Sequence, residues 1–202
     1  MQSLQFYKFF AILAIAYLLF FFTFQSSSTF WYFYTFAILF LMGVSFFFAS
    51  LEDDVQTLEY LLLGVGYGTI TYAIFAASYW IIDWLPFLSV QSIHSFLVSY
   101  GPSTIWHYLL LFFLIAPAEE IFWRGFVQQY LKKYLPTFYA VLAAAALFAI
   151  SLGVGGFFYG AIAGFVVGTL WGLLYEWKKS MPLLIVTHIT ALALLFLILP
   201  IE

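Results

Sequence analysis

Residues 109–126 read LLLFFLIAPAEEIFWRGF. A long apolar run meets two adjacent glutamates, Glu119 and Glu120, and then a single arginine, Arg124. A helix that crosses a bilayer needs roughly 20 apolar residues, and charged side chains inside such a helix are costly and usually functional. The stretch therefore predicts a membrane-spanning helix that ends in a small cluster of charged residues.

The composition of the whole chain also indicates a membrane protein. It has 202 residues, of which 66% are hydrophobic and 7% charged, whereas a soluble domain has about 45–50% apolar and about 25% charged residues. Six Lys or Arg residues form no basic stripe that could bind nucleic acid. The composition excludes a soluble enzyme, a nucleic-acid-binding module and a disordered tail. Without cysteine, the chain has no disulfide, thiol nucleophile or thiolate metal site.

Apolar runs outside this stretch predict the rest of the fold. Backbone polar groups in hydrocarbon must be satisfied internally, so each long run is expected to be a helix. We expect a single all-α membrane domain, 1–202, that forms a polytopic transmembrane helix bundle. Its seven spans are 6–24, 30–51, 58–82, 104–118, 137–152, 156–176 and 181–200. Between Pro86 and Pro102, the weakly amphipathic segment 86–103 is either an interfacial helix, half of an eighth passage or a plain loop.

The lysines predict the orientation of this bundle, because positive charge marks the cytoplasmic side. With seven spans, all five lysines fall on one side: Lys8, Lys132, Lys133, Lys178 and Lys179. The N-terminus is then cytoplasmic, and Asp83 and Glu202 are left outside. A bacterial plasma membrane is the expected location.

Glycines recur every fourth residue in the sixth predicted span. This ladder leaves a bare stripe on one face of the helix, where another backbone can approach closely. The stripe favours internal packing in the bundle, with a dimer face as the alternative. Its members are Gly156, Gly160, Gly164, Gly168 and Gly172.

The charged cluster after residue 118 can be divided by helix geometry. Glu120 and Arg124 are four residues apart, so they can pair on one helix face. Glu119 points about 100° away and has no partner within its own helix. A carboxylate in that position is a candidate general base for water. The alternative is a helix end on the cytosolic side, whose charges are simply solvated.

A histidine in the last predicted span lies at a matching depth. His188 is about seven residues, or roughly 10 Å, inside its span. It could meet Glu119 or Glu120 and form a proton-transfer unit, or it could instead bond to a neighbouring helix backbone. His107 and His94 are expected at the interface, so a metal site with two histidines is not favoured.

Glu119-Glu120-x-x-x-Arg124, followed by a glycine-rich span and then His188, resembles the motifs of the CAAX prenyl protease and bacteriocin-processing (CPBP, Abi) family. That family consists of intramembrane glutamate-dependent endopeptidases. The resemblance covers about 104–198 and implies a CPBP/Abi-like core over 104–200, whereas the N-terminal spans in 1–85 match only in hydrophobicity. It implies that Glu119 activates water, that Glu120 and Arg124 support it, and that His188 is a site histidine. No cofactor is implied, although a divalent metal held by the two glutamates and His188 stays an alternative.

Two positions depart from the family pattern. Leu152 stands where the second motif has histidine, and Leu192 stands where the third has asparagine or aspartate. Leucine can neither accept a proton nor donate to an oxyanion. The sequence thus leaves two hypotheses. One is an endopeptidase that hydrolyses a peptide or membrane protein near the cytoplasmic face. The other is a degenerate pseudoenzyme that acts as a membrane scaffold or regulator. Both imply contact with lipid and none with nucleic acid.

Overall fold

The computed structural model describes residues 2–49, 51–85 and 89–201, and no strand occurs in them. The expected boundary at Pro86 and the terminal Glu202 lie outside the described residues. Helix accounts for 82% of the structure. The all-helical architecture predicted from the apolar runs is therefore confirmed.

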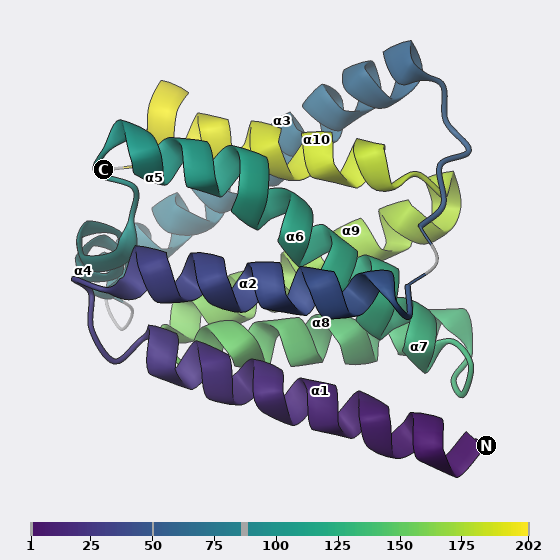
Figure 1. The fold of residues 1–202 in the computed structure, drawn as a ribbon. Helices are drawn as coiled ribbons and strands as arrows, with labels where there is room; N and C mark the ends of the chain where they lie inside the picture. Colours follow the sequence, from purple (N-terminus) through teal and green to yellow (C-terminus); the bar gives the residue numbers. More distant parts are fainter. Residues whose placement is uncertain (1, 50, 86–88, 202) are drawn as a thin grey trace.

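The helices lie along one another in a bundle, with the N-terminus and α7 at one end and α4 at the other (Figure 1). The first four are α1 (Gln2–Thr23), α2 (Phe30–Phe46), α3 (Thr57–Trp84) and α4 (Val90–Tyr100). A continuous helical segment follows: α5 (Ile105–Leu110), η1 (Leu111–Ile115), α6 (Ala116–Glu120), η2 (Ile121–Gln128) and α7 (Gln129–Leu131). The last elements are α8 (Thr137–Gly153), α9 (Phe158–Lys178), α10 (Met181–Ala193) and η3 (Leu194–Ile198).

Five of these segments are long and apolar enough to cross a membrane: Phe6–Thr23, Thr57–Trp84, Ile105–Leu131, Phe158–Lys178 and Met181–Ile198. The other two predicted spans correspond to α2 and α8, which are apolar but have 17 residues each. That length is at the lower limit for crossing hydrocarbon. The chain is thus a helical membrane protein with five candidate spans among its described residues.

The fourth predicted span was too short. It was expected to end at residue 118, but the helix runs on to Leu131. Its charged residues pair with one another inside the bundle, so they do not terminate the helix. Glu119 therefore lies near the middle of the Ile105–Leu131 segment, and its expected position at a cytoplasmic helix end is wrong. The π-helical turns η1 and η2 flank α6, which carries both glutamates.

The glycine ladder packs α9 against α8, as the internal-packing interpretation predicted. A Cβ atom added at Gly168 would lie 3.0 Å from the Ala145 Cβ, and one at Gly164 would lie 3.5 Å from the Ala149 Cα. Because α8 covers this stripe, it is not free to form the alternative dimer face. Gly156 lies outside the helix, where its φ of 78° favours glycine.

A second glycine pair, which the sequence analysis did not single out, packs α3 against α10. A Cβ atom at Gly64 would lie 2.6 Å from Val186, and one at Gly68 would lie 2.7 Å from the Thr187 carbonyl oxygen. Only glycine allows the α3 backbone to come this close. The contact fixes the turn of α10 that precedes His188.

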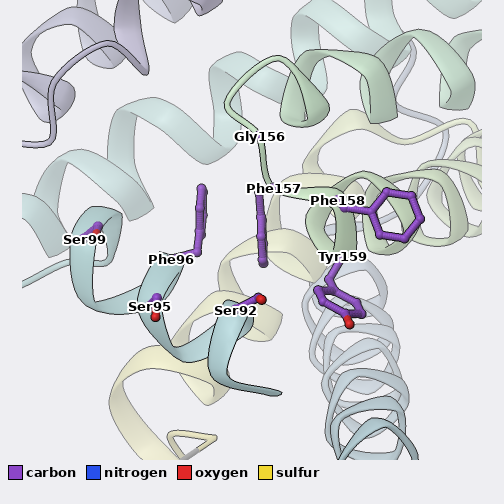
Figure 2. Close-up of a pocket in the computed structure, with 8 residues that line it drawn as sticks. All are labelled: Ser92, Ser95, Phe96, Ser99, Gly156, Phe157, Phe158 and Tyr159. Atoms are coloured by element: carbon purple, nitrogen blue, oxygen red, sulfur yellow. The ribbon is translucent and has the colours of Figure 1, made fainter. Parts of the chain in front are cut away.

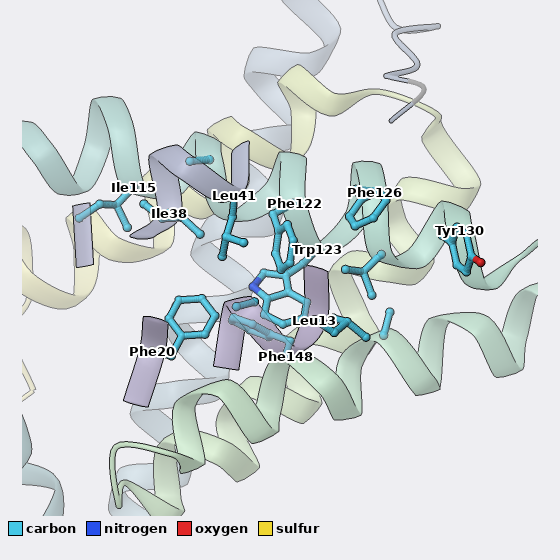
Figure 3. Packing of buried hydrophobic residues seen from close by; sticks show 14 of the residues in the cluster. Leu13, Phe20, Ile38, Leu41, Ile115, Phe122, Trp123, Phe126, Tyr130 and Phe148 are labelled. Carbon is cyan, nitrogen blue, oxygen red and sulfur yellow. The ribbon is translucent and has the colours of Figure 1, made fainter. Parts of the chain in front are cut away.

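Aromatic and aliphatic side chains from α1, α2, η2 and α8 form the main core (Figure 3). The Trp123 ring lies 6.4 Å from Phe20 and 5.6 Å from Phe148, measured between ring centroids. Leu41 and Ile38 of α2 are fully buried beside them. This packing holds the two N-terminal helices against the segment that carries the glutamates.

Segment 86–103 contains a helix, so the plain-loop interpretation is wrong. With 11 residues, α4 is about 16 Å long and too short to cross a bilayer alone. Its Phe96 ring stacks on Phe157 with centroids 3.8 Å apart, and the Ser89 N–H donates to the Tyr159 hydroxyl. Figure 2 shows Ser92, Ser95 and Ser99 of α4 around the hollow beside this stack. The contacts attach α4 to the turn between α8 and α9 and to the first turn of α9.

Candidate active site

The buried ion pair Glu120–Arg124 lies at the bottom of the candidate site. The guanidinium Nη1 lies 3.1 Å from the Glu120 carboxylate, and the two side chains are 2% and 0% exposed. The pairing predicted from their spacing is therefore confirmed. Phe148 and Trp171 lie against the guanidinium, at 4.9 and 5.4 Å from ring centroid to Cζ. Aromatic faces attract a cation, so these rings help to keep a charge inside the bundle.

His188 meets both glutamates. Its Nδ1 lies 2.8 Å from Glu120 Oε1, and its Nε2 lies 3.9 Å from Glu119 Oε2. An ionised carboxylate can only accept, so the tautomer that bonds to an ionised Glu120 carries its proton on Nδ1. In the neutral imidazole, Nε2 then carries the lone pair and faces Glu119. The predicted glutamate–histidine contact is present, and the shorter of the two distances is the one to Glu120.

Glu119 has an additional partner that the sequence analysis missed. The Tyr34 hydroxyl of α2 donates a hydrogen bond to Glu119 Oε1. Glu119 thus has one oxygen bonded to Tyr34 and the other facing His188. No sequence signal singles out Tyr34, because the chain has 15 tyrosines and most lie in apolar runs.

A cavity of about 560 Å³ reaches Glu119 and His188. Apart from these two residues and Tyr34, its inner lining is largely apolar. Leu152 and Leu192, the two positions that depart from the family motifs, are both part of this lining. Histidine or asparagine there would therefore face the same space as Glu119.

The cavity extends towards the end of the bundle where α4 lies. Its lining includes Ile93, Phe96 and Tyr100 of α4, and also Phe24 and Phe30 around the turn between α1 and α2. Figure 1 places α4 and this turn at the end of the bundle away from α7 and the N-terminus. Glu119 is thus reached from the end opposite the lysines.

The remaining histidines do not join this cluster. His107 stacks on Trp31 with ring centroids 4.5 Å apart, near the start of the segment that carries the glutamates. His94 lies on α4 and is exposed. Among the residues that the structure describes, no three His, Cys, Asp or Glu side chains are arranged to hold a metal ion.

The fold and the site define a helical membrane protein with a buried carboxylate–histidine cluster at the inner end of an apolar cavity. Residues 101–194 match the family described as type II CAAX prenyl endopeptidase Rce1-like. This match supports the family assignment, and the matched segment contains Glu119, Glu120, Arg124 and His188. Neither the comparison with curated proteins nor the comparison with solved structures gives a match.

Proposed function

We propose that the protein is an intramembrane endopeptidase of the CAAX protease type. The observation that carries the proposal is the arrangement of two adjacent glutamates in different surroundings. Glu120 is tied to Arg124 and His188. Glu119 faces an apolar cavity and lies 3.9 Å from His188. A positioned carboxylate of this kind can act as a general base.

In the proposed reaction, Glu119 Oε2 accepts a proton from water while the water oxygen attacks the scissile carbonyl carbon. The same proton then passes to the leaving nitrogen as the C–N bond breaks. His188, oriented by Glu120, provides a second polar group beside the reacting water. Arg124 is not among the residues that line the cavity, and it pairs with Glu120.

The proposal includes a topology and a location. Seven spans with a cytoplasmic N-terminus put the lysines inside the cell, and a bacterial plasma membrane is the proposed location. Hydrolysis then takes place at mid-membrane depth, because Glu119 is near the middle of its helix. The proposed substrate is a peptide or membrane protein that reaches Glu119 through the apolar cavity, with no metal or organic cofactor required.

The test compares peptide termini in the membrane proteome of cells that carry the wild type or Glu119→Gln at equal levels. We expect at least one terminus to disappear in the variant. The matched control is Glu59→Gln, which changes an exposed glutamate of α3 and should leave every terminus in place. An unchanged set of termini in Glu119→Gln would contradict the proposal.

A second candidate is supported by a specific observation, since Leu152 and Leu192 make the cavity apolar where the family motifs are polar. Loss of one oxyanion donor costs roughly 10²–10³ in rate. The protein would then be a scaffold or regulator of another membrane protein. This alternative predicts unchanged termini and a co-purifying partner that wild type and Glu119→Gln retain equally.

A further inference from the structure

Tyr34 lies on a helix outside the segment that matches the family. The match covers 101–194, whereas Tyr34 is in the second turn of α2. Its hydroxyl nevertheless donates to Glu119, 85 positions later in the chain. The N-terminal helices therefore contribute a polar group directly to the candidate site.

The groups that face Glu119 come from three elements. Tyr34 approaches from α2, His188 from α10, and Glu120 and Arg124 follow within the same helical segment. Glu120 is already bonded to Arg124 and His188. Tyr34 is thus the residue that donates a hydrogen bond to Glu119 among the described side chains.

Aromatic packing fixes the Tyr34 ring. Phe30 is stacked on it at 5.2 Å, with the ring planes inclined by 13°. Phe20 and Phe24 lie at 6.0 and 6.5 Å. A ring held on several sides directs its hydroxyl to one place, which is the first requirement for a group that orients another.

The two carboxylate oxygens of Glu119 have different partners. Oε1 accepts from Tyr34, and Oε2 faces His188 Nε2 across 3.9 Å. The bond from Tyr34 stops rotation of the carboxylate and leaves Oε2 as the oxygen that can take a proton. The leucines at 152 and 192 supply no competing hydrogen bond to either oxygen.

We propose that Tyr34 is the positioning residue for Glu119, acting in place of polar groups that the family motifs have at Leu152 and Leu192. The role in hydrolysis rests on the proposed peptidase function. The coupling between Tyr34 and Glu119 does not, and it can be measured in the resting protein.

The test is infrared difference spectroscopy of the purified full-length protein in lipid vesicles. Subtracting the spectrum of Glu119→Gln from that of the wild type isolates the carboxyl bands of Glu119, whether the group is protonated or ionised. The same subtraction is made for Tyr34→Phe and for Tyr34→Phe/Glu119→Gln. The matched control is Tyr17→Phe, which removes a hydroxyl that donates to the Leu147 carbonyl on α8.

We expect the Glu119 bands to shift in Tyr34→Phe and to keep their position in Tyr17→Phe. Bands at the same position in Tyr34→Phe as in the wild type would overturn the proposal. A general loss of packing would broaden many bands in both variants, so the specific shift distinguishes positioning from structural support.

Cleavage is then measured on any terminus that depends on Glu119. Misplacement of a reacting group by about 1 Å can cost about a hundredfold in rate, so we expect Tyr34→Phe to cleave at least about tenfold more slowly than Tyr17→Phe. Equal rates in the two variants would overturn the positioning role. If the bands shift but no terminus depends on Glu119, the peptidase proposal fails while the assignment of Tyr34 as the partner of Glu119 stands.

Discussion

Glu119 and Glu120 are neighbours in the sequence but have different surroundings. Glu120 is fully buried and bonded to Arg124 and His188. Glu119 lines the cavity. One of its carboxylate oxygens accepts a hydrogen bond from Tyr34, and the other faces His188. Helix geometry alone separates the two roles, because consecutive residues point about 100° apart. One carboxylate holds the site together and the other faces the space where a substrate could bind.

Removing the Arg124 guanidinium should destabilise the protein strongly. Arg124→Ala leaves the buried Glu120 without its cation, and breaking a buried pair in this way costs about 3–5 kcal/mol. Arg124→Lys keeps a charge but loses the planar contacts with Phe148 and Trp171, so we expect an intermediate loss. The measurement is the free energy of unfolding in mixed detergent micelles, followed by tryptophan fluorescence.

Lys178→Ala is the matched control for the Arg124 variants. Lys178 pairs with Glu59, which is 51% exposed, and such surface pairs contribute about 0–1 kcal/mol. Equal losses in Arg124→Ala and Lys178→Ala would show that the Glu120–Arg124 pair does not stabilise the core.

For single residues, the sequence predicts contacts between neighbours on one helix better than contacts between distant helices. The spacing of Glu120 and Arg124 is enough to predict their contact, and the depth of His188 indicates that it could reach them. Tyr34 could not be found in this way. Its contact with Glu119 depends on where α2 lies beside α6, which no local pattern in 30–51 specifies.

Two sets of glycines decide how the helices pack. The ladder in α9 brings α8 close, and Gly64 and Gly68 of α3 bring α10 close. These helices carry Leu152 and His188 into the cavity lining. The every-fourth-residue spacing predicted the first contact, and the same spacing in 58–82 was a usable signal for the second.

A methyl group at Gly168 should separate α8 from α9. The new Cβ would lie 3.0 Å from the Ala145 Cβ and 3.1 Å from its Cα, so the backbones must move apart. Overpacking of this kind costs about 1–3 kcal/mol. We expect Gly168→Ala to lower the free energy of unfolding by that amount in the same micelle assay.

The matched control is Gly66→Ala on α3, where an added Cβ would meet nothing within 4 Å. Alanine is favoured over glycine inside a helix by roughly 0.5–1 kcal/mol, so this variant should be slightly more stable than the wild type. If Gly168→Ala raised the free energy of unfolding to the same degree, the contact between α8 and α9 would have room for a methyl group, which would contradict the prediction.

The length of the segment from Ile105 to Leu131 could not be predicted from hydropathy. Hydropathy ends a span where charges begin, and it therefore ended this one at residue 118. The charges after that point have partners inside the bundle, because Arg124 pairs with Glu120 in the same helical segment and His188 of α10 contacts Glu120. Whether a charge ends a helix or lies inside it is decided by tertiary contacts, which a window along the chain does not contain.

The whole molecule has two chemically different ends. Lys132 and Lys179 both bind Glu176 at 2.6 Å, and Lys178 pairs with Glu59 nearby. Burial alone would lower the pKa of Lys179, but its hydrogen bond to Glu176 and the charge of Glu52 raise it to about 12. This lysine therefore stays charged at any physiological pH, so it counts as positive charge at this end of the bundle. The other end carries α4 and the outer part of the cavity.

These two ends make the orientation testable and tie it to access to Glu119. If the lysines face the cytoplasm, then the turn between α1 and α2 and the α4 end of the cavity face outward.

The chain has no cysteine, so a single introduced thiol reports without background. Ser27→Cys lies in that turn and Lys133→Cys lies at the lysine end, and both positions are exposed. In intact spheroplasts, a membrane-impermeant maleimide should label Ser27→Cys, whereas Lys133→Cys should react only after lysis. The reverse pattern would place the cavity on the cytoplasmic side. Substrates would then have to reach Glu119 from the cytosol, against the orientation that the lysines favour.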